Sequence, residues 1–392
     1  MSKIVPPTKK FLDSLVDPFL TSQPKGLAFV IGYVGPSFED IYFKGNLANQ
    51  FGKTITLGRD TRFELASISK TFTATLSAAL GTQYQTSWLT QSIQDYTANV
   101  IPGGLQIGSQ FDNIPLSTLL SYTSGLPADN HTVTDLPRLV PTPYSPAGML
   151  GYLNMTSLQP AETGSQYTYS NLAFAIMAQI APLFDSALPD FNTLLSEVVL
   201  NPLEMADTFF FEQLSIDDFA LGYTYASSPA AAVPPGWAVL SAYDGAGGIV
   251  SSPKDMMTWL RFNMGLIEKN KKAKGLTALL KETQTPQTTV KTGGGDQLGL
   301  GWFLAPATSK MPLGSVWKDG EITGTNTFIT FLPWAGTDTP SEAGVFVLTN
   351  CNALELGGIE VVSAIANDVL ITMQGGTPSP DKSNYPRVFG RQ

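Results

Sequence analysis

The sequence predicts a mixed α/β protein of the α+β type: an antiparallel sheet flanked by helices, with a mainly helical inserted domain. Three observations indicate this fold class. Strand-like apolar runs occur near both ends of the chain, a long apolar helix follows the first strands, and helical stretches joined by Pro- and Gly-rich loops occupy the middle. With 392 residues, 43% of them hydrophobic, the chain is long enough to bury a large core.

The N-terminal part begins with a short amphipathic helix, expected at residues 6–22 because apolar residues recur there at helical spacing. Strand patterns follow near 27–35, 38–45 and 53–56, which predicts an antiparallel meander. Small and apolar residues then continue at helical spacing over residues 67–80, without Gly or Pro. This stretch predicts a helix that is buried in the core.

The middle of the chain changes character, with helical patterns at 116–122, 171–184 and 193–203. Strand patterns return at 298–306, 325–333 and 344–350, and a closing helix is expected at 357–374. We therefore expect one α/β domain built from both chain ends, residues 1–80 plus 251–374. Residues 81–250 are expected to form the mainly helical domain, and 375–392, rich in turn-forming residues, an irregular C-terminal tail.

The charge of the chain argues against nucleic acid as a partner. The 23 Lys and Arg face 32 Asp and Glu, a net charge of −9, and there is no long basic run to follow a phosphate backbone. No membrane span is expected, because the apolar stretch 27–35 is too short, and residues 1–20 lack the apolar segment of a signal peptide. The localisation stays open: cytoplasmic for the chain as written, secreted or periplasmic if a leader has been removed.

One cysteine and one histidine limit the chemistry. Cys351 excludes an internal disulfide, and its place at the end of an apolar strand predicts a buried, inert thiol. The usual zinc ligand sets cannot be assembled, and a Ser-His-Asp triad would depend on His131, in a polar loop. We expect His131 to be an ordinary loop residue, and the protein to need no metal and no cofactor.

A Ser-x-x-Lys pair on a helix offers a nucleophile that needs no histidine, because residues three apart share one helix face. The pattern occurs five times, at Ser22, Ser67, Ser251, Ser315 and Ser379. Only Ser67 opens a long apolar helix directly after a strand-like run, where free backbone N–H groups of the first turn can face a developing oxyanion. Burial of Lys70 in this helix is expected to lower its pKa towards that of a usable base.

The Tyr-x-Asn pattern occurs twice, at 152–154 and at 169–171. The first lies inside an expected amphipathic helix, where packing or exposure accounts for both side chains. The second follows a turn-rich segment and precedes an apolar helix, so its side chains can project from a loop into a cleft. Tyr169 is therefore the candidate for a second proton-transfer group, and a tyrosine that only packs against the core is the alternative.

Five motifs follow one another along the chain: the Ser-x-x-Lys segment at 65–74, LLSYTSGLP at 119–127, YTYSN at 167–171, GAGGIVSSPKDM at 245–256 and GLGW at 299–302. In this order they resemble the serine β-lactamase and penicillin-binding-protein superfamily, in particular its class C-like branch, which also holds DD-peptidases and family VIII carboxylesterases. The likeness covers roughly residues 25–370, and its specificity comes from the ordered set, because each motif alone is common. The resemblance implies a β-lactamase/transpeptidase-like fold and an acyl-enzyme mechanism.

Two triplets compete for the third signature of this superfamily, which is Lys-Thr-Gly or His-x-Gly on a strand beside the nucleophile helix. The triplet 291–293 matches in letters, but it precedes GLGW and stands in a run of glycines that favours a turn. The triplet 318–320, Lys-Asp-Gly, follows GLGW and leads into two apolar strands, as in relatives. We assign the signature to Lys318 and interpret residues 291–295 as a glycine-rich surface turn.

Carried over to this sequence, the resemblance implies that Ser67 is the nucleophile, Lys70 the neighbouring base and Tyr169 the proton shuttle. Asn171 would bind the substrate amide, and Lys318 would supply positive charge near Tyr169 and a substrate carboxylate.

The strand segment after Lys318 completes the implied site and also departs from the family pattern. Gly320 belongs to the substrate-binding triplet, and the backbone N–H groups of Ser67 and Glu321 would form the oxyanion hole. Asp319 replaces the usual Thr, so a hydroxyl that binds a β-lactam carboxylate is missing and a like charge stands nearby. Glu321 stands where relatives often carry a small residue. These departures weaken the case for efficient antibiotic hydrolysis.

The sequence thus predicts a serine hydrolase that acts through an acyl-enzyme on a small-molecule ester or amide, with carboxylesterase or peptidase activity favoured over β-lactamase activity. Two alternatives stay open: a biosynthetic transacylase that uses the same serine, and a non-catalytic penicillin-binding-type protein. Tyr223, Tyr225 and Trp237 lie where relatives wall the substrate cleft. They are expected to set the acyl-group preference, with plain aromatic packing as the alternative. The sequence gives no signal for an oligomeric state.

Overall fold

The structure is a computed structural model, and it describes residues 4–21, 26–84, 87–129, 145–154, 159–184, 189–210, 219–224, 231–233, 241–267, 271–334, 339–352, 355–356 and 359–378. His131, Tyr225 and Trp237, which the sequence singled out, lie outside the described residues. Ser22 and the tail from Ser379 onward lie outside them as well.

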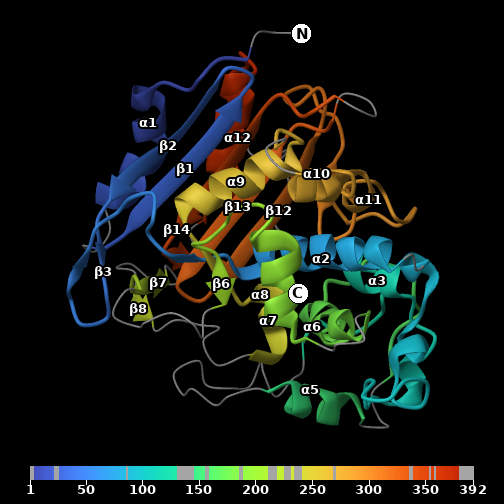
Figure 1. Cartoon of the computed structure of the whole chain (residues 1–392). Helices are drawn as coiled ribbons and strands as arrows, with labels where there is room; N and C mark the ends of the chain where they lie inside the picture. Colours follow the sequence, from blue (N-terminus) through green and yellow to red (C-terminus); the bar gives the residue numbers. More distant parts are fainter. Residues whose placement is uncertain are drawn as a thin grey trace.

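The core of the fold is a seven-stranded sheet to which both ends of the chain contribute (Figure 1). Its order is β10-β11-β12-β13-β14-β1-β2, and every neighbouring pair runs antiparallel. The strands are β1 (Ala28–Gly35), β2 (Phe38–Gly45), β10 (Gln297–Leu298), β11 (Phe303–Ala305), β12 (Ser315–Ile322), β13 (Thr325–Phe331) and β14 (Gly344–Thr349). Strand β1 pairs with β14, with Phe29 opposite Thr349. The predicted antiparallel sheet built from both chain ends is confirmed.

Helices cover both faces of this sheet. Helix α12 (Val361–Met373) packs against β13 and β14, and α9 (Pro253–Asn263) packs against β1 and β14. Figure 1 shows α9 in front of the strands and α12 behind them. Strands β1 and β14 are buried along their whole length. This explains why both read as continuous apolar runs rather than as the alternating pattern of a half-exposed strand.

Helix α2 (Ser69–Gln83) lies between the sheet and the helical part of the molecule, with α3 (Leu116–Leu120) and α6 (Asn171–Ile180) on its far side (Figure 1). A single 3-10 turn, η1 (Ala66–Ile68), leads into it and packs against β12 and β13. Residues 69–81 are all buried, as expected for a helix whose small and apolar residues surround it. One ring of α2, Phe72, stacks on Trp259 of α9 with 3.7 Å between ring centroids.

The remaining elements are short. The helices are α1 (Lys9–Thr21), α5 (Pro146–Leu153), α7 (Phe191–Leu195), α8 (Asp244–Gly247), α10 (Lys271–Thr277) and α11 (Leu280–Thr283). Single turns are η2 (Trp88–Thr90), η3 (Ile93–Tyr96), η4 (Ser109–Phe111), η5 (Ala181–Phe184), η6 (Ser196–Leu200) and η9 (Ser241–Tyr243). Small sheets are formed by β3 (Leu47–Ala48) with β4 (Thr54–Ile55), by β5 (Phe63–Glu64), β9 (Ile249–Ser251) and β6 (Phe209–Phe210), by β15 (Cys351–Asn352), β7 (Gly222–Thr224) and β8 (Ala231–Val233), and by β16 (Glu355–Leu356) with β17 (Ile359–Glu360).

Several predicted elements differ from the structure. The closing helix expected at 357–374 begins only at Val361, after β17. The strand expected at 298–306 is two strands, β10 and β11, because the chain turns at Gly301, whose φ of +75° favours glycine. The strand expected near 53–56 is the short β4, which pairs with β3 outside the main sheet. The helix expected at 193–203 is α7 followed by a π-helical turn. The division into two domains and a tail stays a prediction.

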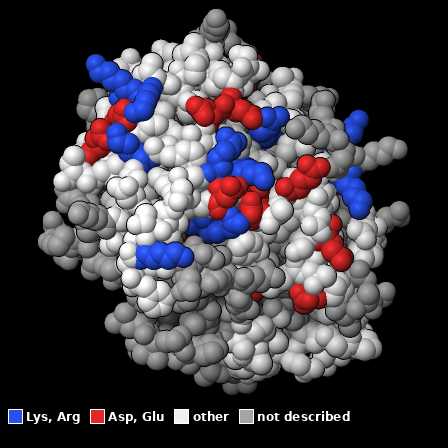
Figure 2. All heavy atoms as spheres, turned by 60° about the vertical axis from the view of Figure 1, so that its left-hand side comes forward, with Lys and Arg blue, Asp and Glu red and all other residues white. Residues whose placement is uncertain are grey.

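Charged side chains on the surface lie beside side chains of opposite sign. Figure 2 shows Lys and Arg interspersed with Asp and Glu over one face of the molecule. Lys44 lies 2.8 Å from Asp13 and 3.0 Å from Asp17, and Arg62 lies 2.5 Å from Asp207. Among the described residues, the face in Figure 2 therefore shows no continuous track of positive charge. Within the described ranges, no helix is both long and apolar enough to cross a membrane.

Candidate active site

Ser67 lies in the turn that leads into α2, next to a strained backbone position. Ala66, directly before it, has a φ of +47°, a left-handed conformation that costs a residue with a side chain about 1–2 kcal/mol. Ser67 is the middle residue of η1 and Lys70 belongs to the first turn of α2. Ser67 is 7% exposed and Lys70 is fully buried. Strain of this kind persists where the surrounding structure holds a side chain in one geometry.

Three oxygen atoms surround the Lys70 amine. Its Nζ lies 3.0 Å from Ser67 Oγ, 2.6 Å from Asn171 Oδ1 and 2.7 Å from the carbonyl oxygen of Ala246. The amide and carbonyl oxygens can only accept hydrogen bonds, so each takes one N–H of the amine. A neutral amine has two N–H bonds and one lone pair, and the lone pair is then left for the Ser67 hydroxyl. The three contacts fit this neutral form, in which Ser67 donates to the amine, as well as an ammonium that donates all three hydrogen bonds.

The electrostatic surroundings favour this neutral form. Burial lowers the pKa of Lys70 well below its ordinary value of 10.5, and the positive charge of Lys318 lowers it further. The carboxylates of Asp129 and Asp319 raise the pKa of Lys70 and so act in the opposite direction. Burial has the largest effect, so the free amine is available at a lower pH than for an exposed lysine.

Tyr169 lies close to two lysines. The Nζ atoms of Lys70 and Lys318 are 4.9 Å and 5.3 Å from the centroid of its ring. Its hydroxyl hydrogen-bonds with Ser67, and its ring stacks on Tyr122 at 5.4 Å between centroids. Burial raises the pKa of Tyr169 well above 10, so its phenol stays protonated and can donate a proton.

Strand β12 brings Lys318 to this group of side chains. Lys318 is fully buried, and its ammonium donates to the Asp319 carboxylate at 2.7 Å and to the Asp319 carbonyl at 2.8 Å. Strand β11 pairs with β12 only as far as Trp317. Within the described residues, the edge of β12 from Lys318 onward therefore has no strand beside it on that side.

Only glycine fits at position 320. A Cβ there would lie 2.2 Å from the carbonyl oxygen of Leu65 and 2.3 Å from Thr327 Oγ1, both well inside a normal contact distance. The same Cβ would lie 3.2 Å from the backbone nitrogen of Ser67. Strand β12 thus approaches η1 closely, and the neighbouring strand β13 is held at the same turn, because the hydroxyl of Thr327 donates to Leu65 at 2.9 Å. Glu321, whose N–H was predicted to share the oxyanion hole, follows this contact directly.

Asn171 begins α6, and both ends of its side-chain amide are engaged. Its Oδ1 accepts a hydrogen bond from Lys70, and its Nδ2 donates to the two carboxylate oxygens of Asp129 at 3.0 and 3.2 Å. In this structure the Asn171 amide hydrogen-bonds within the protein, and its expected role in binding a substrate amide stays a prediction. Sequence reasoning did not single out Asp129. The residue stands in the polar loop after LLSYTSGLP, but nothing local to that loop places it against the start of a helix.

Comparison with known proteins identifies the family. The family model described as Beta-lactamase matches residues 12–361. The chain belongs to the β-lactamase family. A β-lactamase of Pseudomonas fluorescens is 29% identical over 307 residues, which cover 77% of this chain and 76% of the relative. The D-alanyl-D-alanine-carboxypeptidase/endopeptidase AmpH of Escherichia coli strain K12 is 25% identical over 346 residues, 83% of this chain and 80% of the relative.

Solved structures share the fold of this β-lactamase-family chain. A class C β-lactamase in complex with cefoxitin has a TM-score of 0.71 at 21% identity. The match covers 93% of this chain and 98% of the class C β-lactamase. The octameric penicillin-binding protein homologue from Pyrococcus abyssi has a TM-score of 0.72 at 18% identity. That match covers 96% of this chain and 78% of the homologue. The predicted superfamily and fold are thereby confirmed, and the chain is a serine hydrolase of the β-lactamase-related superfamily.

The competing motifs of this β-lactamase-family chain lie elsewhere. Lys291 is exposed and bridges to Gln297 across a turn in which Gly295 has a φ of +92°. The interpretation of residues 291–295 as a glycine-rich surface turn is therefore confirmed. Ser252, next to Ser251 of another Ser-x-x-Lys match, caps α9 by accepting a hydrogen bond from the backbone N–H of Asp255 at 3.2 Å.

Tyr223 lies in β7 and is buried. A Cβ added at Gly26 would lie 2.5 Å from the Tyr223 hydroxyl, so this hydroxyl stands beside the start of β1. That position agrees with the packing alternative, and a role in acyl-group preference stays a prediction. Cys351 pairs with Tyr223 in the neighbouring strand and is buried as expected, and burial raises the pKa of its thiol to about 12.

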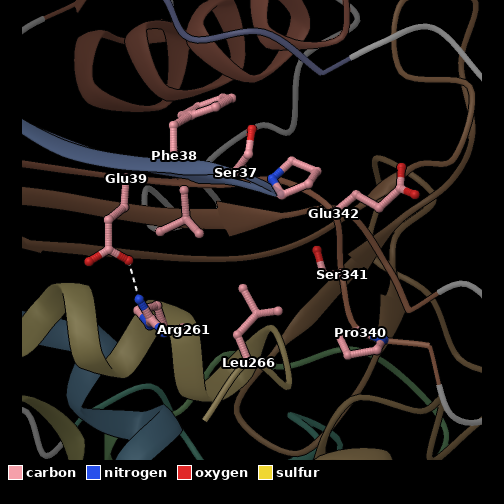
Figure 3. A pocket seen from close by; sticks show the side chains of 11 residues that line it. Ser37, Phe38, Glu39, Arg261, Leu266, Pro340, Ser341 and Glu342 are labelled. Carbon is pink, nitrogen blue, oxygen red and sulfur yellow. Dashed lines mark hydrogen bonds and ion pairs between the residues drawn. The ribbon is translucent and has the colours of Figure 1, made fainter.

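A groove lies at the β1–β2 turn, apart from the candidate active site (Figure 3). Its volume is about 790 Å³, and Arg261 of α9 pairs with Glu39 of β2 on its wall. Strand β1 stands three places from β12 in the sheet order, and none of the side chains around Lys70 lines the groove. The groove is therefore separate from the chemistry described above.

Proposed function

We propose that this protein hydrolyses esters of uncharged acyl groups. The acyl group is transferred to Ser67, which forms an acyl-enzyme. The observation that carries the proposal is the 3.0 Å distance between Lys70 Nζ and Ser67 Oγ, with the other two hydrogen bonds of the amine taken by acceptor-only oxygens. This arrangement supports a lysine base that needs no histidine.

In the proposed mechanism Lys70 takes the proton of Ser67 while Ser67 Oγ attacks the ester carbonyl. The backbone N–H groups of Ser67 and Glu321 stabilise the oxyanion. Tyr169, kept protonated by its raised pKa, donates its proton to the leaving alkoxide and is reprotonated by Lys70. A water then attacks the acyl-enzyme and loses its proton to Lys70, the bond between the acyl carbon and Ser67 Oγ breaks, and Lys70 returns the proton to Ser67. A positioned base contributes roughly 10²–10⁴-fold and one oxyanion donor about 3–4 kcal/mol.

Two internal contacts support an uncharged substrate. The family resemblance implies that Lys318 meets a substrate carboxylate, but here its ammonium already donates to Asp319. The resemblance also implies that Asn171 meets a substrate amide, but its Nδ2 already donates to Asp129. A substrate carboxylate would also approach the negative charge of Asp319. A simple ester needs neither contact, so it fits the site better than a β-lactam or a D-Ala-D-Ala peptide.

A substrate panel tests the proposal. A short-chain p-nitrophenyl ester, a chromogenic cephalosporin and a D-Ala-D-Ala peptide are each assayed with and without an added alcohol or amine. We expect the ester to be hydrolysed fastest, and a dominant cephalosporin rate would overturn the ranking. Product formed on the added alcohol or amine in preference to water would favour the transacylase.

Covalent labelling tests the nucleophile itself. An uncharged fluorophosphonate should label the wild-type protein and not Ser67→Ala, while Ser165→Ala, in an exposed turn, should label normally. A folded wild-type protein that does not label would favour the non-catalytic alternative.

A further inference from the structure

We propose that Asp129 is a positioning residue for the acylation step: it fixes the Asn171 amide in one orientation and places a negative charge close to the Lys70 amine. This inference rests on the proposed function, because it requires that Lys70 accepts the proton of Ser67. It adds a second loop to the machinery, one that contains neither the nucleophile nor its base.

The first part of the argument is the orientation of the amide. The Nδ2 of Asn171 donates to both oxygens of Asp129, at 3.0 and 3.2 Å, and its Oδ1 accepts from the Lys70 amine at 2.6 Å. A flipped amide would set its oxygen against the carboxylate, which is repulsive, and its N–H would take the amine lone pair that Ser67 needs. The Asp129 carboxylate thus selects the one orientation in which Asn171 accepts an N–H of Lys70. That bond in turn leaves the amine lone pair for Ser67.

The second part is the rigidity of the loop that carries Asp129. The backbone N–H of Asn171 donates to the carbonyl of Ala128 at 2.7 Å, and the hydroxyl of Ser170 donates to the carbonyl of Pro127 at 2.6 Å. Three consecutive loop residues are therefore each bonded to the start of α6. A carboxylate held in this way keeps its position before substrate arrives, which is what a positioning residue requires.

The third part is electrostatic. The titratable groups that face Lys70 are Lys318 and Asp319 from β12, Tyr169 from the segment before α6, Ser67 from η1 and Asp129 from its loop. Burial and the charge of Lys318 lower the pKa of Lys70, whereas Asp129 raises it. Removal of the Asp129 charge must therefore lower the pKa of Lys70. The neutral amine then persists to lower pH, and the acidic limb of the acylation profile moves to lower pH.

The experiment measures the second-order rate constant of fluorophosphonate labelling across pH for the full chain and its variants. Asp129→Asn keeps the shape and an acceptor for Asn171 but removes the charge, so we expect its acidic limb at lower pH than in the wild type. Asp129→Ala removes the acceptor too, and its plateau should fall by about tenfold or more, the size of a lost charge-assisted hydrogen bond. Asp190→Asn is the matched control, because Asp190 accepts from Thr193 at the start of α7 and has no contact with Lys70.

The outcomes separate the two proposals. If the wild-type protein labels and Asp129→Asn leaves the acidic limb where it was, the positioning role is overturned and the proposed function stands. A lower melting temperature in Asp129→Ala, with an unshifted profile in Asp129→Asn, would show a merely structural residue and would also overturn it. If the wild-type protein does not label at all, the proposed function fails and this inference falls with it.

Discussion

The pairing of Lys318 with Asp319 predicts that one substitution changes the charge preference of the site. Asp319→Thr removes the carboxylate that lies 2.7 Å from the Lys318 ammonium and supplies a hydroxyl in its place. The ammonium, on a fully buried side chain, then lacks its acidic partner, and a substrate carboxylate can take that place. We expect kcat/KM for a chromogenic cephalosporin, which carries a carboxylate, to rise relative to kcat/KM for a p-nitrophenyl ester.

The size of the change follows from the contact that becomes available. A hydrogen bond to a charged group contributes about 1.5–3 kcal/mol, so the ratio of the two kcat/KM values should rise roughly ten- to a hundredfold. Burial lowers the pKa of Lys318 and Asp319 raises it, so this pKa is lower in the variant than in the wild type. The rise in the ratio of the two kcat/KM values requires that Lys318 carries its positive charge. It should therefore be largest at low pH and disappear as the pH rises through the lowered pKa of Lys318.

The assay is the initial rate on both substrates over a range of pH. Glu321→Gln is the control, because it also removes one negative charge from β12 but leaves the pair of Lys318 and Asp319 intact. A ratio in Asp319→Thr that stays at the wild-type value refutes the reasoning. An equal rise in Glu321→Gln refutes it as well, because the effect would then come from overall charge and not from the pair.

Three further predictions test the assignment of the site and the packing behind it. Lys318→Ala should lower ester turnover by more than about tenfold. Lys291→Ala, in an exposed turn, should leave ester turnover nearly unchanged. Initial rates in the reverse order would contradict the assignment of the signature triplet to residues 318–320. Gly320→Ala should abolish fluorophosphonate labelling and lower the melting temperature, because its methyl group would lie 2.2 Å from a backbone oxygen. A variant that labels normally speaks against the close approach of β12 to η1. Trp259→Ala should lower the free energy of unfolding by about 3–5 kcal/mol in urea titrations, because this fully buried ring stacks on Phe72. A change under about 1 kcal/mol would show that the stack contributes little.

The sequence by itself determined most of the long elements and the order of the motifs. The pair of Ser67 and Lys70 followed from helical spacing and from the strand before it, and the choice of Lys318 over Lys291 followed from position relative to GLGW. These are properties of the chain read along its length. They can be recognised without a structure because each depends on residues that are close in sequence or on a fixed order.

Only the tertiary structure decided which atoms complete the site. The oxygens of Asn171 and Ala246 that hold the Lys70 amine come from positions 101 and 176 residues away. No periodicity relates them to Ser67, and the role of Asp129, one contact further out, depends on where its loop meets α6. The ion pair of Lys318 and Asp319 joins adjacent residues. The sequence does not predict it, because it depends on the burial of Lys318 in β12, where its ammonium lies 2.7 Å from the Asp319 carboxylate. Burial and long-range contact set these charges, and both arise only when the chain is folded.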